Sequence, residues 1–582
     1  MSIDQTKPAT GPSKIVTAAF VIAMVAYAAG LCVNPGRAND LFWQLRTGQL
    51  ILANHAVPYV DTYSWTRRGA PWVAHEWLAF VLYWLCYSWK GFVGIWLLTA
   101  AVVSATAVLL YRLILKETSK ASAAGGYGAP STALVLSTIA LTVAGIFFQP
   151  RPQVFTYFFV LVTLAFIARI RDHGPSRAQW LLVPIFALWA NLHAGVLVGL
   201  GLLVLFAAGD AVMFYIKKGE AVRWRSIGIL AGVCFLATFA TPYTYREYQD
   251  FSATISNTAM LNAVGEWASP NYHDPFGKLF EGYVLLLVAG ICLTRLRRDP
   301  VELTILVILA HEGLTESRNV PIFALVATVL MARHLQSTLI RVLNGDRLPI
   351  VDNLPQLPSD SLFGPTPSVV IAAAISVAIC FSAAMRTQSM IQGSAPTHGS
   401  TLSRIALASI AYGDYPAHAA AFIEGENIPA RVHEYNTYDD GGYLIWRLPD
   451  RPVFVDSRAD VYFGSMFENV KKVIDGTIDW RGLMDKNDVD MIISPVDEAQ
   501  SRGYLAAQDW ALVYVDRPNI DKHRSTYDSN NTFIFIRRTP QYADLIARCR
   551  RDCPAVAQMS AVSVTQGASS PTGSFSNYLS LK

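Results

Sequence analysis

Charged residues are scarce in this sequence. Asp, Glu, Lys and Arg make up 15% of the 582 residues, against roughly 25% in an ordinary soluble protein. Hydrophobic residues make up 52%, which is more apolar surface than one set of soluble cores could bury. The composition excludes a soluble multidomain enzyme, a disordered protein and a small disulfide scaffold. Long apolar runs recur up to residue 385 and charge concentrates afterwards, which predicts a polytopic α-helical membrane protein with a C-terminal soluble domain.

Other familiar signals are also missing. The sequence contains no Walker or dinucleotide-binding fingerprint and no internal repeat. A net charge of +4, without a basic stripe interleaved with aromatics, does not indicate nucleic-acid binding. Most of the seven cysteines lie in apolar runs and are predicted to be small core residues. Cys549 and Cys553 form a C-x-x-x-C pair in the polar tail, which could form a disulfide if that tail is extracytoplasmic.

The apolar runs predict the membrane spans. The first, from Ile15 to Val33, is longer than a signal-peptide core and lacks a clear cleavage site, so we expect an uncleaved span. The run 77–115 splits near Lys90, and we predict 11 crossings in total, with 13 as the alternative. If the N-terminus is inside, the inner loops hold more than twice as many Lys and Arg as the outer loops. This asymmetry favours that orientation and places the C-terminal domain outside.

These observations predict the domain organisation. The membrane part begins with a cytoplasmic tail (1–14), followed by a transmembrane module (15–338) that includes a long first outer loop (34–76). A cytoplasmic loop (339–366), a last span (367–385), an extracytoplasmic domain (386–554) and a disordered tail (555–582) follow. In the extracytoplasmic domain, apolar alternation predicts strands near 432–435, 442–448, 452–456, 489–493, 511–515 and 532–537, with helices over 464–475 and 496–507. That order indicates an α/β sandwich.

Polar residues gather at the presumed outer turns. Asp40 lies just after the first span, and the apolar residues that follow it predict a helix lying in the membrane interface. The other outer turns each carry a small polar set, namely Arg151 between two prolines, Asn191 with His193, Tyr243 with Arg246, Glu266 with Trp267, and His311, Glu312, Glu316, Arg318 and Asn319. If the helices form a bundle, these turns converge on one outer-face cavity.

Each feature also has a purely structural interpretation. Asp40 could be a helix N-cap, and one residue can be both a cap and a catalytic base. Arg151 could extend to lipid headgroups, although its rigid Pro-Arg-Pro turn favours a site. The tryptophans of these loops could be interfacial anchors. In the C-terminal domain, 439–442 is predicted to be a turn. Asp456, Arg458 and Asp460 follow a predicted strand and could bind a ligand, but an internal ion pair is the favoured interpretation.

The arrangement resembles the GT-C superfamily of polyprenyl-phosphate-dependent glycosyltransferases, and more closely a group of uncharacterised bacterial GT-C-like membrane proteins. The likeness covers roughly residues 15–540 and rests on an acidic residue just outside the first span, a long first outer loop and a C-terminal extracytoplasmic domain. Its segments are Asp40–Gly48, Trp72–Leu78, Leu188–His193, Gly265–Trp267, Arg318–Phe323, Asp440–Trp446 and Val455–Arg458.

The resemblance implies sugar transfer on the outer face of the bacterial cytoplasmic membrane, from a polyprenyl-phosphate donor to a glycan, lipid or protein acceptor. The resemblance maps onto Asp40 the first-loop acid that, in GT-C enzymes, acts as base or orients the acceptor. Many relatives have two adjacent acids there, whereas this chain has Asn39 and Asp40, so the second acid would be Glu76 or Asp61. An inverting transfer needs a carboxylate for the acceptor proton and cations at the leaving phosphate. Predicted substrate-binding residues are Arg151, Arg318, Arg246, His193, Asn191, Glu266, Trp43 and Trp267.

Some GT-C enzymes bind a divalent metal and others do not, and the candidate ligands here are His75, Glu76, His193, His311 and Glu312. The absence of a nucleotide-binding motif agrees with a lipid-linked donor. Two other functions remain open. A glycolipid transporter or flippase would need polar or broken helices near the bilayer midplane, where acids are few. A non-catalytic scaffold for envelope polysaccharide assembly would also carry these motifs.

Overall fold

A computed structural model of the chain describes residues 14–33, 36–121, 129–216, 220–257, 265–343, 400–462, 479–495, 503–516 and 532–552, with isolated helical positions between 374 and 389. Several predicted segments lie wholly or mostly outside these residues. They are the cytoplasmic loop beyond residue 343, the last span, the helix over 464–475, most of the helix over 496–507, Cys553 and the tail over 555–582.

The chain forms two compact units. We call the first the helical unit, which comprises Met1–Asn34, Trp96–Thr244 and Glu266–Gln392. The second, the α/β unit, comprises Pro35–Ile95, Tyr245–Gly265 and Gly393–Lys582. Our predicted division differs, because it placed the first outer loop with the transmembrane module. In the structure that loop belongs to the same unit as the C-terminal part of the chain, because Asp61 of the loop pairs with Arg458.

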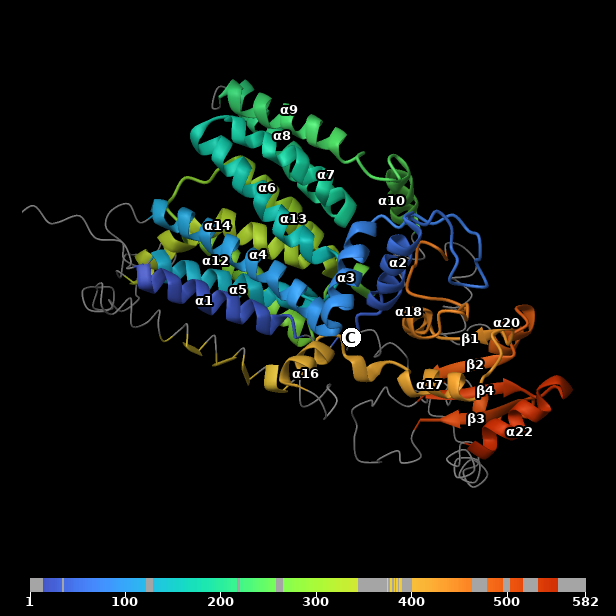
Figure 1. Ribbon diagram of the computed structural model, residues 1–582. Coiled ribbons are helices and arrows are strands. Elements are labelled where there is room, and N and C mark those ends of the chain that lie inside the picture. Colours follow the sequence, from blue (N-terminus) through green and yellow to red (C-terminus); the bar gives the residue numbers. More distant parts are fainter. Residues whose placement is uncertain are drawn as a thin grey trace, which may run out of the picture. The chain divides into compact units, whose positions relative to one another are not determined.

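The helical unit is a bundle of apolar helices (Figure 1). Its helices are α1 (Lys14–Leu31), α4 (Phe92–Ala121), α5 (Ala129–Ala144), α6 (Gln153–His173), α7 (Leu182–Leu192), α8 (Val196–Tyr215), α9 (Ala221–Ala237), α12 (Pro275–Leu293), α13 (Pro300–Thr315) and α14 (Val320–Leu343). In the described part of the chain, 6 helices are long and apolar enough to cross a membrane. They are Phe92–Ala121, Ala129–Phe147, Gln153–His173, Val196–Tyr215, Pro275–Leu293 and Ser317–Val342.

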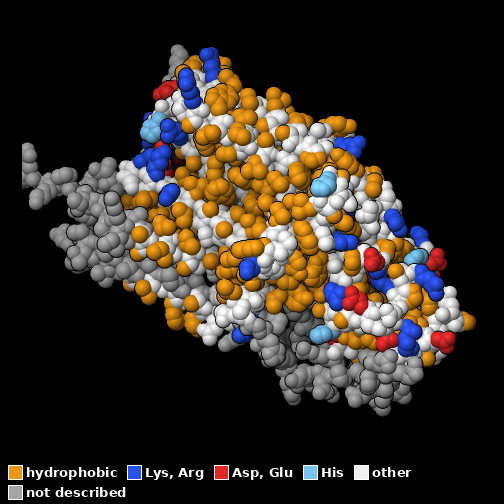
Figure 2. Space-filling view, in the orientation of Figure 1, with side chains coloured by type: hydrophobic (Ala, Val, Ile, Leu, Met, Phe, Trp, Pro, Cys, Tyr) orange, Lys and Arg blue, Asp and Glu red, His pale blue; other side chains and the backbone are white. Residues whose placement is uncertain are grey.

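These spans confirm the predicted class, a multi-pass α-helical membrane protein. The helix α14 packs against α5, α6, α12 and α13 and is the most buried of the six. Large hydrophobic side chains such as Val212, Ile229 and Leu285 are exposed on the outside of the bundle, and hydrophobic side chains predominate over these helices in Figure 2. This is the surface that lipid would cover. The count of 11 crossings stays a prediction, since α7, α9 and α13 have 11, 17 and 16 residues.

The apolar run 77–115 is broken at Gly91, which confirms the predicted split. The helix α3 (Trp77–Lys90) ends there, and α4 begins at Phe92. Gly91 has φ +59, a left-handed conformation that glycine adopts without the steric cost of a Cβ. The two pieces are therefore separate helices rather than one long span.

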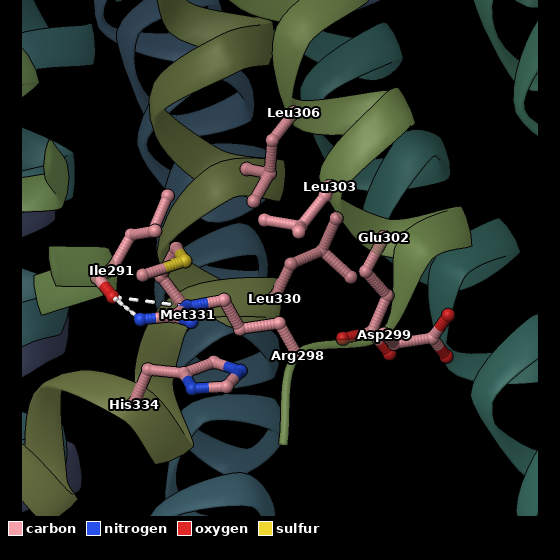
Figure 3. A pocket seen from close by; sticks show the side chains of 9 residues that line it. All are labelled: Ile291, Arg298, Asp299, Glu302, Leu303, Leu306, Leu330, Met331 and His334. Carbon is pink, nitrogen blue, oxygen red and sulfur yellow. Dashed lines mark hydrogen bonds between the residues drawn. The ribbon is translucent and has the colours of Figure 1, made fainter. Parts of the chain in front are cut away.

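At one end of the bundle, two arginines hold three carboxylates. Arg171 Nη2 lies 3.1 Å from Asp210 Oδ1 and 2.6 Å from Asp299 Oδ2, and its Nη1 lies 3.2 Å from Glu302 Oε1. Arg333 Nη2 lies 2.5 Å from Glu302 Oε2. The network joins α6, α8, α13 and α14 where charged side chains would otherwise be costly. Beside it is a pocket of about 10 Å³ (Figure 3), room for about one water molecule.

The α/β unit contains a four-stranded sheet in the order β1-β2-β4-β3, drawn in orange and red in Figure 1. The strands are β1 (Glu434–Tyr435), β2 (Met491–Pro495), β3 (Trp510–Val515) and β4 (Thr532–Arg537). β1 runs parallel to β2, and the other pairs are antiparallel. The helices of this unit are α2 (Leu41–Asn54), α3, α10 (Arg246–Ser256), α16 (Thr401–Ala408), α17 (Ala417–Gly425), α18 (Tyr438–Arg447), α20 (Trp480–Lys486) and α22 (Ala543–Asp552).

The described residues also form short 3-10 helices, at Gly145–Phe147, Arg177–Leu181, Gly265–Trp267, Ser317–Asn319, Tyr412–Asp414, Tyr504–Ala506 and Pro540–Tyr542. The last three predicted strands are confirmed to within two residues, and a helix does follow Asp40. The predicted strand 442–448 is wrong, because these residues belong to α18, with Leu448 as its C-cap. Two acids in the first turn of α18 interact favourably with the helix dipole. The predicted strand 452–456 forms only a single bridge, between Val453 and Ser64.

A buried arginine explains why the first outer loop belongs to the α/β unit. The Arg458 guanidinium is fully buried and lies 2.6 Å from Asp456 Oδ2 and 2.7 Å from Asp61 Oδ1. Its planar face stacks on Tyr63 and Trp72, at 4.9 Å and 4.5 Å from the ring centroids. The predicted ion pair of Asp456 and Arg458 is therefore present, and it recruits Asp61 from the loop.

Replacing Arg458 with Ala would leave two buried carboxylates without their cation. Breaking such a pair costs about 3–5 kcal/mol, so we expect the apparent unfolding temperature of the detergent-purified protein to fall by several degrees. Tryptophan fluorescence is a suitable probe because Trp72 contacts Arg458. Arg481→Ala is the control, since Arg481 is 45% exposed and 3.7 Å from Asp509, and we expect its effect to stay within about 0.5 kcal/mol. Equal unfolding temperatures for the two variants would contradict this prediction.

Candidate active site

In the helical unit, the structure brings Arg151 to Glu266. Arg151 lies in the turn before α6, between Pro150 and Pro152, and its guanidinium forms a fork around the carboxylate. Nη1 donates to Oε2 at 2.8 Å and Nη2 donates to Oε1 at 3.1 Å. Both side chains are mostly buried, with 23% and 22% exposed. A bidentate pair of this kind is stronger and more directional than a single-contact ion pair.

Arg318 contacts Trp267, the residue that follows Glu266 in the chain. Its guanidinium lies 4.0 Å from the centroid of the Trp267 ring, a cation–π contact. The two segments are also tied by their backbones, because the Ser317 amide and hydroxyl both donate to the Ala268 carbonyl at 2.9 Å. Two turns that are far apart in sequence thus present one arginine each to the same short segment. We call Arg151, Glu266, Trp267 and Arg318 the arginine cluster.

The charges of the arginine cluster determine the ionisation of Glu266. Burial by itself would raise the pKa of this carboxyl, but the positive charges of Arg151 and then Arg318 outweigh it and lower the pKa to about 2. Glu266 is therefore ionised at every physiological pH. The Tyr157 hydroxyl also interacts electrostatically with Arg151, Glu266 and Arg318. Sequence reasoning missed Tyr157, because it lies inside an apolar run and no local pattern marks it.

His193 is held in one tautomer by its neighbours. Its Nδ1 accepts from the Gly195 backbone N–H at 2.9 Å and lies 2.8 Å from Thr156 Oγ1. Trp189 Nε1 donates to that same Thr156 oxygen at 3.0 Å. Because Nδ1 is an acceptor, the proton of the neutral ring is on Nε2. His193 thus offers a directed N–H donor in the same unit as the arginine cluster.

Asn191 has a different position. Its amide nitrogen donates to the Ala187 carbonyl at 2.8 Å and to the Ala240 carbonyl at 2.9 Å. These bonds join the end of α7 to the segment that follows α9. Substrate binding by Asn191 remains a prediction, and the contacts described give it a role in holding this turn.

In the α/β unit, the segment that carries Asp40 is anchored to α18. Arg37 Nη2 lies 2.6 Å from Asp440 Oδ1, and Asn39 Nδ2 donates to Asp439 Oδ1 at 2.8 Å. A Cβ at Gly442 would lie 2.5 Å from the Asn39 carbonyl oxygen, which is too close for any side chain. The motif over 439–442 is therefore the first turn of a helix and the support for Asp40, rather than a free-standing turn.

Asp40 occupies the N-cap position of α2, but its side chain makes no capping hydrogen bond. Instead, Trp43 Nε1 donates both to Asp40 Oδ1 at 3.3 Å and to Ser457 Oγ at 3.0 Å. Trp43 is only 7% exposed, so it is a buried support for Asp40 rather than an open platform for a sugar ring. Burial and the charge of Asp40, ahead of three other acids, raise the pKa of the Tyr438 phenol well above its usual value. Tyr438 therefore remains a neutral donor near Asp40.

The two candidates for a second acid lie in different environments. Asp61 is fully buried and accepts from the Ser64 hydroxyl at 2.6 Å as well as from Arg458. Glu76 lies 3.7 Å from His75 Nε2 and 3.5 Å from Gln44 Nε2. The contacts of Asp61 are structural, which leaves Glu76 as the predicted second acid.

The structure brings Asp250, which sequence reasoning missed, into electrostatic contact with Asp460. Burial and then the charge of Asp250 raise the pKa of Asp460 to about 7, and burial raises the pKa of Asp250 to about 6. Asp250 lies on α10, about two hundred residues from Asp460 in the chain, so only the folded structure reveals their interaction. The predicted ion pair of Arg458 is made with Asp456 and Asp61, and Asp460 interacts electrostatically with Arg458 and Asp456.

The predicted site residues thus fall into two groups. Arg151, His193, Glu266, Trp267 and Arg318 are in the helical unit, whereas Asp40, Trp43, Glu76 and Arg246 are in the α/β unit. Arg246 begins α10, with its guanidinium 5.7 Å from the centroid of the Tyr59 ring. A single outer-face cavity that contains both groups stays a prediction.

The residues described by the structure do not assemble a metal centre. Among them there is no group of three or more His, Cys, Asp and Glu side chains that could hold a metal ion. The predicted ligands are divided, with His75 and Glu76 in the α/β unit and His311 and Glu312 in the helical unit. Glu312 accepts from Asn319 Nδ2 at 3.3 Å. A bound divalent ion stays a prediction, and the proposed reaction does not use one.

Fold and site together define a class, namely a multi-pass α-helical membrane protein with an appended α/β unit and a cationic cluster at the turns between helices. No family model and no curated protein matches the sequence. Among solved structures, the chain is similar to ArnT from Cupriavidus metallidurans in the apo state, with 13% identity, a TM-score of 0.45 and coverage of 90% of this chain and 97% of that chain.

The chain is also similar to ArnT from the same organism bound to undecaprenyl phosphate, with 12% identity and a TM-score of 0.40, over 90% of this chain and 98% of that chain. Because both TM-scores are below 0.5, the function proposed for this chain rests on its own residues.

Gly442→Ala tests whether α18 positions Asp40. The new Cβ would collide with the Asn39 carbonyl and contact Trp43 at 3.1 Å, so the backbone around Asp40 must shift. We expect faster amide hydrogen exchange in a peptide that covers residues 36–47. Gly482→Ala is the matched control, because its Cβ would meet nothing within 4 Å. Unchanged exchange in Gly442→Ala would show that α18 does not hold this segment.

Proposed function

We propose that the protein is a membrane glycosyltransferase that moves a sugar from a polyprenyl-phosphate donor to an envelope glycan, lipid or protein acceptor, on the outer face of the bacterial cytoplasmic membrane. The observation that carries this proposal is the arginine cluster. Two cations from separate interhelical turns surround one carboxylate and one tryptophan in a unit built from membrane-spanning helices. A phosphate on a lipid carrier is the ligand that this chemistry suits.

The arginines would act on the leaving group. When the bond between the sugar and the phosphate oxygen breaks, negative charge develops on that oxygen, and preorganised cations stabilise it most effectively. A guanidinium suits this role because its planar fork matches phosphate oxygens and is always charged. Arg318 is the candidate for direct contact, because its guanidinium is held by the face of Trp267. Arg151, whose terminal nitrogens contact Glu266, contributes its charge.

Asp40 would act on the acceptor. In an inverting transfer, the acceptor oxygen forms a bond to the anomeric carbon as the bond to the phosphate oxygen breaks, and the hydroxyl proton passes to a carboxylate base. The side-chain hydrogen bonds of Arg37 and Asn39 to α18 and the hydrogen bond from Trp43 support this role. They hold the Asp40 carboxylate without using it as a helix cap.

The transport alternative receives less support from the helical unit. A transporter would use polar groups near the membrane midplane, and the acids on α8 and α13 include Asp210 and Glu302. Both are engaged by Arg171 at helix ends. The neighbouring pocket of about 10 Å³ is far too small for a sugar lipid. These acids are better explained as a structural ion network. The scaffold alternative is addressed by the experiment below.

The proposal is tested by the transfer of radiolabel from polyprenyl-phosphate sugars to a membrane-lipid or glycan extract, catalysed by purified protein in lipid. We expect transfer with the wild type and a loss of at least about a hundredfold in Asp40→Asn, because removal of a general base typically costs 10²–10⁴-fold. Donor binding should persist in this variant. In Arg318→Gln, donor binding itself should be lost.

Asp544→Asn is the matched control, because Asp544 is an exposed acid on α22, and its transfer rate should equal that of the wild type. Normal transfer by a folded Asp40→Asn would remove Asp40 from the mechanism. Donor binding without transfer to any acceptor, in a folded wild-type protein, would favour the scaffold.

A further inference from the structure

Glu266 raises a question that the proposed function does not answer. A site for a phosphate anion contains an acid, and both oxygens of that acid are bonded to one of the two arginines. A carboxylate at this position weakens the attraction of the arginine cluster for any anion. Glu266 must therefore have a role other than increasing the affinity of the site for phosphate.

The groups that face Glu266 come from several elements. Arg151 lies in the turn before α6, Tyr157 is on α6, His193 follows α7 and Arg318 precedes α14. Glu316 interacts electrostatically with Arg318 as well, but it is partly exposed and its carboxylate accepts from Asn319 at 3.1 Å. Glu266 is the acid in direct contact with an arginine, and the positive charges around it keep it ionised.

The reaction changes the charge of the lipid phosphate. A polyprenyl-phosphate sugar is a phosphodiester with one negative charge. When the bond between the anomeric carbon and the phosphate oxygen breaks, the electron pair stays on that oxygen, and the lipid leaves as a phosphomonoester with a charge of about −1.5 to −2 at pH 7. A fixed carboxylate beside the phosphate repels the monoester more strongly than the diester, because the repulsion grows with the charge of the ligand.

We propose that Glu266 is a specificity-determining residue that selects phosphate ligands by charge, so that the arginine cluster accepts a lipid phosphodiester and disfavours the lipid phosphomonoester. This inference rests on the proposed function and deepens it. In the reaction, Glu266 promotes release of the spent lipid carrier and limits product inhibition. The Glu266 carboxylate lowers the affinity of the arginine cluster for every phosphate ligand, and the positive charge of Arg318 offsets this loss.

The test compares two probes, a short-chain polyprenyl monophosphate and its methyl diester, whose binding to purified protein in detergent is measured at pH 8 and pH 5. At pH 8, Glu266→Gln should bind the monophosphate at least about tenfold more tightly than the wild type does, with a smaller gain for the diester. At pH 5 the monophosphate carries about one charge, because its second pKa is about 6. The extra gain for the monophosphate should then disappear.

The methyl diester keeps its charge between these pH values, so it reports any change in the protein itself. Glu266→Asp keeps the carboxylate and should retain the preference of the wild type for the diester. Glu281→Gln is the control for the loss of a negative charge, because Glu281 is an exposed acid on α12, and it should bind both probes as the wild type does.

Two results would overturn the inference while leaving the phosphate site intact. One is an equal gain for both probes in Glu266→Gln at pH 8, and the other is weaker binding of both, which would mean that Glu266 only positions Arg151. A third result would overturn the proposed function as well, namely that wild-type protein binds neither probe or that Arg318→Gln binds both unchanged. The failure of the inference and the failure of the proposed function are therefore distinguishable.

Discussion

The buried guanidinium of Arg458 is the interaction on which the α/β unit depends. It joins Asp456, two residues away, to Asp61, almost four hundred residues away in the chain. A buried charge is costly unless an opposite charge pairs with it, so Asp61 has to come to Arg458, and the loop that contains Asp61 comes with it. The anchoring of Asp40 on α18 follows, because Asn39 and Asp40 lie on the same segment.

Charge pairing at low exposure organises the helical unit too, with two different outcomes. Arg171 on α6 and Arg333 on α14 pair with three acids of α8 and α13, which ties these four helices together. The arginine cluster has two cations around Glu266, and Trp267 covers one of them. The difference between a structural network and a candidate site is thus the balance of charge and the stacking of Arg318 on an aromatic ring.

The two groups of candidate residues serve different parts of one proposed reaction. In that proposed reaction, the cations of the helical unit would act on a lipid-borne phosphate, and Asp40 of the α/β unit would act on an acceptor hydroxyl. In each unit, the surrounding backbone fixes the position of the candidate residues. A proline on each side orders Arg151, and α18 holds the segment of Asp40 through Gly442. Preorganisation of this kind is what electrostatic catalysis requires.

Much of the architecture could be predicted from the sequence, because it depends on local composition. The apolar runs become helices wherever about twenty residues lack charge, and the break at Gly91 follows from the polar residues around it. The β2, β3 and β4 strands also follow from short apolar runs. Local pattern failed at 442–448, where seven residues are too few to separate a period of 2 from one of 3.6, and two acids and a close contact with Asn39 favour the helix.

The sequence by itself determined which residues are chemically unusual for their place, namely Asp40, Arg151, Glu266 and Arg318 among apolar surroundings. Only the tertiary structure decided what each one contacts. It assigned Asp61 to Arg458, paired Arg151 with Glu266, and revealed Tyr157 and Asp250, which no local pattern marks. The physical reason is that an ionisable side chain inside a protein acquires its role from the charges around it. Those charges come from segments that lie far apart in the sequence and meet only when the chain folds.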